Sequence, residues 1–150
     1  VKSIHSSSYQ IEALQALQGK VSFNVEQFSE IVESIPSPSY QVEAIKAIIY
    51  NNTVPEGSWV VAACRAISSH SYQVEASRAL ATKLQTISST EVEDILSTVS
   101  SPSYQMEIVT VLAPKVPVAQ RRSLLQVINN KMPRSYRDEA QDFVNNLSLQ

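Results

Sequence analysis

The sequence has few of the residues that usually carry chemistry or signal a compartment. It contains one cysteine, Cys64, and two histidines among 150 residues, so no internal disulfide can form and no Cys/His cluster has metal-site spacing. No apolar run reaches the roughly 18 residues that a membrane helix needs. Charged residues make up 17% and the net charge is −2, which gives no electrostatic reason to expect nucleic acid or an anionic membrane as partner.

Glycine is also scarce, since only Gly19 and Gly57 occur. The short connections must therefore be built from Pro, Ser, Asn and Thr. A hydrophobic content of 43% is nevertheless ordinary, and 150 residues suffice for one domain with a substantial core. The chain starts at Val1, not at methionine, inside a repeat, so we expect a segment or processed product of a longer chain. The compartment stays open, and Asn-X-Ser/Thr patterns at Asn51 and Asn146 matter only if the protein is secreted.

One six-residue pattern recurs from end to end of the chain. It reads Ser-Tyr-Gln-Val-Glu-Ala at 39–44, and the tyrosines of its five copies are Tyr9, Tyr40, Tyr72, Tyr104 and Tyr136. They recur every 31 or 32 residues, a period typical of stacked units that cannot bury their apolar faces alone. We therefore read 1–150 as a single repeat domain with repeats 4–34, 35–66, 67–98, 99–130 and a partial repeat 131–150.

Each full repeat contains two helical patterns. The first begins at Ser37, Ser69 and Ser101, each followed by proline or histidine, which suits an N-cap before N1; the serine two residues on is the alternative cap. The second carries i, i+3, i+4 apolar stripes such as Phe28, Ile31 and Val32. Its starts are marked by a Thr90–Glu93 capping box and by Pro55 and Pro117 near N1. With no sustained strand-like alternation, the sequence predicts an all-α fold of about nine helices.

The Ser-Tyr-Gln helix resembles the second helix of HEAT-like repeats, especially the short kind found in bilin-lyase-type proteins. The family pattern reads Val-Arg, two variable residues, Ala, two more, Ala-Leu. Here Tyr40-Gln41 stands at Val-Arg, Ala44 and Ala47 at the alanines, and Ile48 at the leucine. The resemblance covers essentially the whole chain and implies a right-handed α-solenoid of about four and a half repeats, with the Ser-Tyr-Gln helices on its concave side.

The departures from the family pattern lie at its basic position. The family often uses an Asp-to-Arg ladder between units, and only Arg137 matches its basic residue. A neutral row is the candidate substitute for that ladder: Gln10, Gln41, Gln73 and Gln105.

By this likeness, an apolar row would project into the concavity beside a row of glutamates. The apolar row is Ile11, Val42, Val74 and Met106; the glutamates are Glu12, Glu43, Glu75, Glu107 and Glu139; Gln15, Lys46, Arg78 and Thr110 follow one turn further. An apolar stripe edged by carboxylates would offer a groove to a helix or an extended peptide. The glutamates have a second reading, as a solvated stripe in which Glu43 pairs with Lys46 and Glu75 with Arg78 at i, i+3.

Several other residues have alternative interpretations. The tyrosine rings are expected to fill the inter-repeat core with their hydroxyls at a polar edge, rather than to recognise a ligand. Trp59 stands in an otherwise polar column, so it is either an interface anchor or packed beside Gly57 or the adjacent turn. Cys64 aligns with apolar residues and is predicted to be a buried small hydrophobe.

The histidines and the basic residues of the C-terminal end also have two readings each. His5 and His70 suit turns or caps better than ligands or bases. A C-terminal basic group either is a solvated patch or docks an acidic partner: Arg121, Arg122, Lys131, Arg134 and Arg137.

The sequence therefore favours a non-enzymatic scaffolding module that binds a protein or peptide along its concave surface, with no cofactor, metal or catalytic residue. An enzyme accessory such as a bilin-lyase-type chaperone is the alternative. HEAT-like hydroxylases carry His-Glu pairs, whereas His5 and His70 precede serines here, and HEAT-like DNA glycosylases need a cationic concave face. The third hypothesis is a structural spacer within a longer solenoid.

Overall fold

The computed structural model describes residues 7–16, 23–49 and 55–147. These residues form nine α-helices and two short 3₁₀-helices, with no strand among them. The bounds are α1 Ser7–Ala16, α2 Val25–Glu33, α3 Pro38–Ile49, α4 Gly57–Ala66, α5 His70–Ala81, α6 Ser89–Thr98, α7 Pro102–Leu112, η1 Ala113–Lys115, η2 Val118–Gln120, α8 Arg121–Lys131 and α9 Arg134–Asn145. The all-α prediction is confirmed, and the five Ser-Tyr-Gln helices are the odd-numbered ones.

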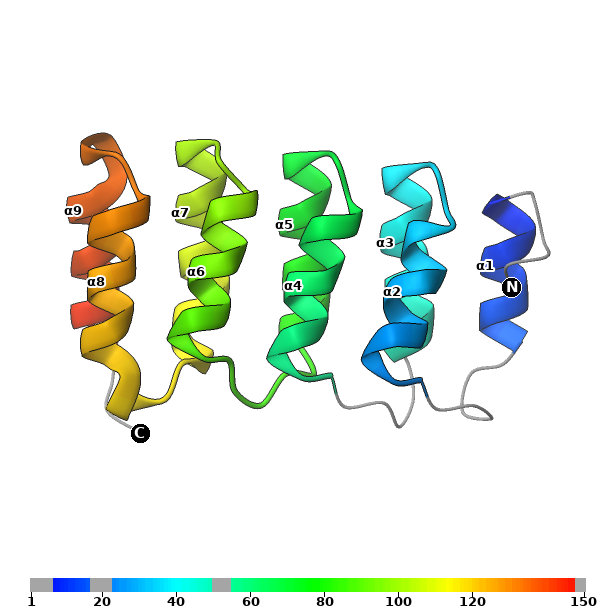
Figure 1. Ribbon diagram of the computed structural model, residues 1–150, viewed down its shortest axis with the longest axis horizontal. Coiled ribbons are helices and arrows are strands. Elements are labelled where there is room, and N and C mark those ends of the chain that lie inside the picture. The colour runs from blue at the N-terminus through cyan, green and yellow to red at the C-terminus, as the bar shows by residue number, and fades with distance from the viewer. Residues whose placement is uncertain (1–6, 17–22, 50–54, 148–150) are drawn as a thin grey trace.

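The helices form two rows that run along the longest axis of the molecule (Figure 1). Within the odd row, α1 contacts α3, α3 contacts α5, α5 contacts α7 and α7 contacts α9; the even row repeats this order from α2 to α8. Helices of opposite rows also touch, as α4 and α5 do. The apolar core fills the space between neighbours in a row and between the two rows, so each helix is stabilised mainly by the helices on either side of it.

The odd-numbered helices begin where the serine-proline pattern predicted. Ser69 and Ser101 are the N-cap residues of α5 and α7, and their carbonyls accept the amides of Gln73 and Gln105 at 2.8 Å. The serine hydroxyls do not cap the helices; that of Ser69 lies 3.1 Å from the Ser71 hydroxyl instead. The cap position is thus confirmed, and the alternative cap two residues on is wrong because that serine lies inside the helix.

The start of α6 differs from the predicted Thr90–Glu93 capping box. The N-cap is Ser88, whose side chain accepts the amide of Glu91, while the Glu91 carboxylate accepts the Ser88 amide at 3.0 Å. The register is set by a hydrophobic staple, since Ile87 before the cap and Val92 in the next turn are both buried. Pro55 lies two residues before the first residue of α4, near N1 as predicted, and Pro117 is the N-cap of the 3₁₀-helix η2 that leads into α8.

A buried row of glutamine side chains joins the two helix rows. Gln41 of α3 donates through Nε2 to the carbonyl of Val32 in α2 at 3.0 Å and to that of Ala66 in α4 at 3.2 Å. Gln105 of α7 donates in the same way to Leu96 in α6 and Lys131 in α8, at 2.9 and 3.3 Å. These carbonyls belong to helix C-terminal turns, which have no intrahelical partner for them. The glutamine row is therefore a hydrogen-bonded ladder between units; the Gln10 side chain lies outside the described part.

Gln73 and Arg137 vary this arrangement. Gln73 donates to the carbonyls of Cys64 and Ile67 at 2.7 and 2.8 Å, and its Oε1 lies 2.7 Å from His70 Nδ1. Because the amide oxygen can only accept, Nδ1 of His70 must carry the proton. His70 is thus a first-turn residue of α5 that supports the ladder, whereas His5 lies outside the described residues. In α9, the Arg137 guanidinium replaces the amide and donates to Met132 at 3.1 and 3.2 Å.

Trp59 belongs to the core, and its assignment as a partner anchor is wrong. The side chain is 4% exposed, and its ring packs on Phe28 of α2 with centroids 4.5 Å apart. The equivalent positions of the even helices face the preceding helix of that row. Glu91, which aligns with Trp59, lies against Gly57 of α4 in the same way. A large ring at that position fills the space between α2 and α4.

Replacing Gln41 by leucine is expected to lower the free energy of unfolding by about 1–3 kcal/mol, because it keeps the volume but leaves the Ala66 carbonyl without a donor and the Val32 carbonyl with the Ile35 amide alone. Urea unfolding followed by circular dichroism measures the loss. Gln126→Leu on exposed α8 surface is the matched control and should change stability by no more than about 0.5 kcal/mol. Equal effects of the two substitutions would contradict the ladder's role.

Trp59→Ala is expected to cost about 3–5 kcal/mol, since it removes a buried ring and leaves a cavity against Phe28. Trp59→Phe keeps an aromatic ring in contact with Phe28 and should cost clearly less. Both values follow from urea titrations monitored by circular dichroism. A loss under about 1 kcal/mol for Trp59→Ala would show that the ring is not packed in the core.

Candidate functional site

Exposed charges on the odd-numbered helices pair between neighbouring helices. Lys46 Nζ of α3 lies 3.7 Å from Glu75 Oε1 of α5, and Arg78 Nη2 of α5 lies 3.9 Å from Glu107 Oε1 of α7. The sequence interpretation paired these cations within their own helix, Lys46 with Glu43 and Arg78 with Glu75. The stacking instead brings the glutamate of the next helix into reach. Such half-exposed pairs contribute about 0–1 kcal/mol each, so they hold the register only weakly.

The glutamate row is solvent-exposed along the whole odd row. We call this surface the outer face; it consists of Tyr9, Tyr40, Tyr72, Tyr104, Tyr136, Glu12, Glu43, Glu75, Glu107, Glu139, Lys46 and Arg78. All five glutamates and both cations are exposed. No cation of the described residues lies within ion-pair distance of Glu43 or Glu139. The outer face is therefore acidic, and its two cations stand between glutamates of successive helices.

The apolar row that was expected beside the glutamates faces inward. Ile11, Val42 and Val74 are 7%, 1% and 3% exposed, and Met106 is half-buried against the core. Consecutive residues on a helix point about 100° apart, so Val42 and Glu43 cannot both lie on the outer face. The stacking of odd helices turns this row into their mutual contact. The exposed apolar stripe of the predicted groove is thus wrong: Ile11, Val42 and Val74 are core residues, and Met106 packs half-buried against the core.

The tyrosine row is more exposed than expected. Tyr72, Tyr104 and Tyr136 pack partly against the core, as predicted, but Tyr9 and Tyr40 are 63% and 41% exposed. They are the large hydrophobic side chains with the greatest exposure among the described residues. Tyr104 also lies near His70 of the preceding odd helix, with ring centroids 6.3 Å apart. The core reading therefore fails for Tyr9 and Tyr40, which present aromatic surface next to the glutamates.

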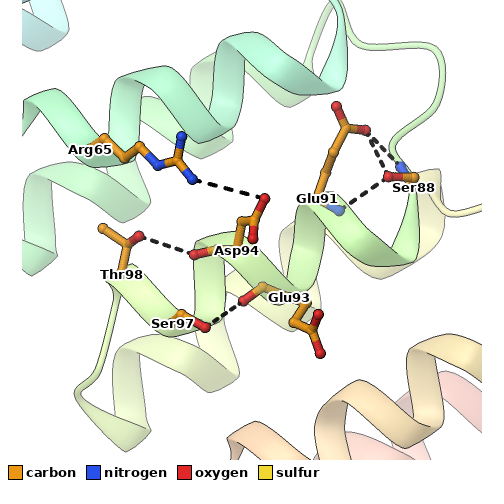
Figure 2. A network of polar contacts seen from close by, with 7 residues as sticks. All are labelled: Arg65, Ser88, Glu91, Glu93, Asp94, Ser97 and Thr98. Atoms are coloured by element: carbon orange, nitrogen blue, oxygen red, sulfur yellow. Dashed lines mark hydrogen bonds and ion pairs between the residues drawn. The ribbon is translucent and has the colours of Figure 1, made fainter.

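The even row also carries an ion pair built on the same rule (Figure 2). Arg65 of α4 reaches Asp94 of α6 at 4.0 Å, next to the capped N-terminus of α6 where Glu91 holds Ser88. In all three pairs the acid follows its cation by 29 residues, one repeat less one helical turn. This 29-residue spacing was visible in the sequence, but pairing charges only within a helix, at i, i+3, does not reveal it. In the last turn of α6, the hydroxyls of Ser97 and Thr98 donate to the carbonyls of Glu93 and Asp94, one turn back.

Cys64 is buried in the core, as predicted from its apolar column. It is 1% exposed, and its Sγ lies 3.4 Å from the Ser77 hydroxyl, which donates to the Gln73 carbonyl at 2.8 Å. Burial raises the pKa of the Cys64 thiol to about 11, although the Ser77 contact opposes the rise. The thiol therefore stays protonated at neutral pH, and protonated thiols are poor nucleophiles. Ser77 was not singled out from the sequence, because it is a lone polar residue in an apolar column.

One cleft lies where loops precede the even helices. It has a volume of about 610 Å³ and is lined by the segments around Pro55, Thr86 and Pro117. A second of about 220 Å³ adjoins it and includes Lys115 and Arg121. Two members of the C-terminal basic group have hydrogen-bond partners. Arg121 Nη1 donates to the Leu147 carbonyl at 3.4 Å at this cleft, and Arg137, at the opposite end of α8, donates to the Met132 carbonyl. Arg122, Lys131 and Arg134 are exposed.

The parts of the chain that the structure describes contain neither a metal-binding cluster nor a membrane-spanning helix. No group of three or more His, Cys, Asp or Glu side chains there is placed to hold a metal ion. None of the helices in those parts combines the length and the hydropathy required to cross a membrane. The Asn51 pattern falls outside the described residues, as does Ser148 of the Asn146 pattern.

Comparison with protein-family models, with curated proteins and with solved structures found no match to this chain. The resemblance to HEAT-like repeats therefore rests on the residues of the chain itself.

The Cys64 thiol is expected to make stability fall as the pH rises from about 9 to about 11. Because burial raises the pKa of the thiol, the folded protein holds the proton more tightly than the unfolded chain does. The stability that results is fully present below the unfolded pKa and is lost as the pH rises through the folded pKa. The expected loss is on the order of 2 kcal/mol. Urea midpoints across this range measure it.

Cys64→Ala serves as the control for the other groups that titrate in alkali. Its stability should fall less steeply over the same pH range, whatever its value at neutral pH. Rapid alkylation of Cys64 by iodoacetamide in the native protein at pH 8 would also contradict a buried thiol, because native-state reaction requires access and deprotonation.

Proposed function

We propose that the chain is a non-enzymatic protein-interaction module, built as a right-handed HEAT-like solenoid of about four and a half repeats. Two rows of helices, each contacting its own kind in sequence, support this architecture. Stacked repeats present extended surfaces on which equivalent side chains fall into rows. The partner, a protein or a peptide, binds along the outer face, which the HEAT-like arrangement makes the concave side.

The observation that carries this proposal is the regularity of the outer face. Every odd helix contributes one exposed glutamate with a tyrosine one turn before it, and weak ion pairs link α3 to α5 and α5 to α7 along these rows. Because packed helices fix the backbone of this surface, little ordering entropy is lost on the protein side when a partner binds. Tyrosine adds contact area at a low conformational cost.

The charge of the outer face selects the partner. The outer face carries five glutamates and only two cations, Lys46 and Arg78. A basic or amide-rich segment is therefore favoured and an acidic one is repelled. Apolar burial comes from the exposed rings of Tyr9 and Tyr40, because Val42 and its equivalents are part of the core. Cys64 supports a binding role over a nucleophilic one, since its thiol is buried and protonated.

The triple variant Glu43→Lys, Glu75→Lys, Glu107→Lys is expected to lose partner binding by at least about tenfold, because it reverses the charge at the centre of the outer face. The measurement is quantitative affinity capture from the native source, with wild type and variant immobilised side by side. Circular dichroism should show an unchanged helical spectrum, since the residues are exposed and their ion pairs are weak.

Glu26→Lys, Glu33→Lys, Glu93→Lys is the matched control, with the same change in net charge on the even row. It should retain the partners that wild type retains. If the outer-face variant kept the same partners at the same affinity, the outer face would be excluded as the binding surface. If both triple variants lost them equally, net charge and not the outer face would be responsible.

A further inference from the structure

The outer face offers the same pair of side chains at each step along the odd row. Glu43, Glu75, Glu107 and Glu139 are exposed, and the tyrosine three residues earlier in each helix is exposed or half-buried. Residues three apart are neighbours on a helix surface. Each helix therefore presents one aromatic ring edge beside one carboxylate.

The distance between successive pairs follows from helix packing. Neighbouring odd helices are in contact, and packed helices lie about 8–10 Å apart. The Lys46–Glu75 and Arg78–Glu107 contacts at 3.7 and 3.9 Å join positions one turn apart on neighbouring helices, so successive glutamates lie within side-chain reach of the adjacent helix. A ligand that uses successive pairs must repeat its own side chains at about the same interval.

One regular peptide conformation has this interval on one side. A polyproline II helix has 3 residues per turn and a rise of about 3.1 Å, so every third side chain recurs on the same side after about 9 Å. In a β-strand, side chains alternate between faces, so the third residue points away from the protein. An α-helix repeats one face about every 5.4 Å, so only every second turn, after about 10.8 Å, approaches the interval between odd helices.

The side chains of the outer face suit such a ligand chemically. Exposed aromatic rings pack against proline in the recognition of polyproline II segments. Glu43 and Glu139 have no cation in ion-pair distance among the described residues, and the half-exposed pairs of Glu75 and Glu107 are weak enough to exchange for a cation of the ligand. Arginine adds a planar group that can bind a carboxylate through two hydrogen bonds.

We propose that the outer face binds a polyproline II segment that carries a basic side chain, preferably arginine, at every third residue. The segment runs across the odd helices, with one basic residue at each glutamate and its prolines against the tyrosine rings. This inference rests on the proposed function and adds the conformation and the sequence period of the partner.

The test is a titration of the protein with a fluorescein-labelled peptide of five Arg-Pro-Pro triplets, about 45 Å long when extended, followed by fluorescence anisotropy. Three control peptides are matched to it. One has the same composition with arginines displaced from the three-residue period, one replaces each arginine by glutamate, and one replaces the prolines by glycine and serine. The periodic peptide should bind at least tenfold more tightly than each control.

Protein variants locate the site. Tyr40→Ala and Glu43→Gln should each weaken the periodic peptide by about three- to tenfold, the range of one aromatic or charged contact, whereas Glu33→Gln in α2 on the even row should leave it unchanged. Circular dichroism verifies folding of each variant.

The outcomes separate this inference from the proposed function. Equal binding of the periodic and displaced peptides, still weakened by Glu43→Gln, would overturn the period and keep the outer face as a site for basic segments. Failure of all basic peptides would overturn the inference, while the capture experiment with the triple variants would still decide whether the outer face binds a different kind of partner. Binding unaffected by Tyr40→Ala and Glu43→Gln would overturn the location.

Discussion

The structure depends on how the last carbonyls of the even helices find donors inside the stack. These groups have no intrahelical partner, and a buried carbonyl without a donor costs about 1–3 kcal/mol. A glutamine amide has two N–H donors, so Gln41 serves the ends of α2 and α4 together and fixes both against α3. A carboxylate could not do this, because it only accepts. At α9 the Arg137 guanidinium takes over the donor role.

This ladder and the core leave each odd helix only a narrow exposed strip. In α3, α5 and α7, neighbours cover the helix on both sides and the even row covers its back, so serine, tyrosine, glutamate and one cation or polar residue remain for solvent. Because the strip repeats with the stack, weak contacts can add along its length. A binding surface of this kind gains affinity from regularity across helices and not from one deep cleft. A cleft of about 610 Å³ lies instead among the loops that precede the even helices.

More of the fold than of the surface could be predicted from the sequence. Helix starts at Ser69 and Ser101 and the burial of Cys64 followed from local spacing and from the column of aligned residues. The N-cap position of α6 did not follow from local spacing, because two Ser/Thr-x-x-Glu patterns overlap there, Ser88–Glu91 and Thr90–Glu93. The buried Ile87 before Ser88 favours the first. Trp59 misled for a related reason: its column is polar elsewhere, yet the column faces a neighbouring helix, where Phe28 gives the ring a partner.

The sequence by itself determined the repeat, the two helices in each unit and the exposed glutamate row, because period and polarity are written into the order of residues. Only the tertiary structure decided the environment of the row that begins with Ile11, of Tyr40 and of the cations at 46 and 78. A helix in a stack is covered on three sides, so a residue's neighbours come from helices about 30 residues away in the chain. Valine at 42 is therefore core, while tyrosine at 40, two residues earlier, meets solvent.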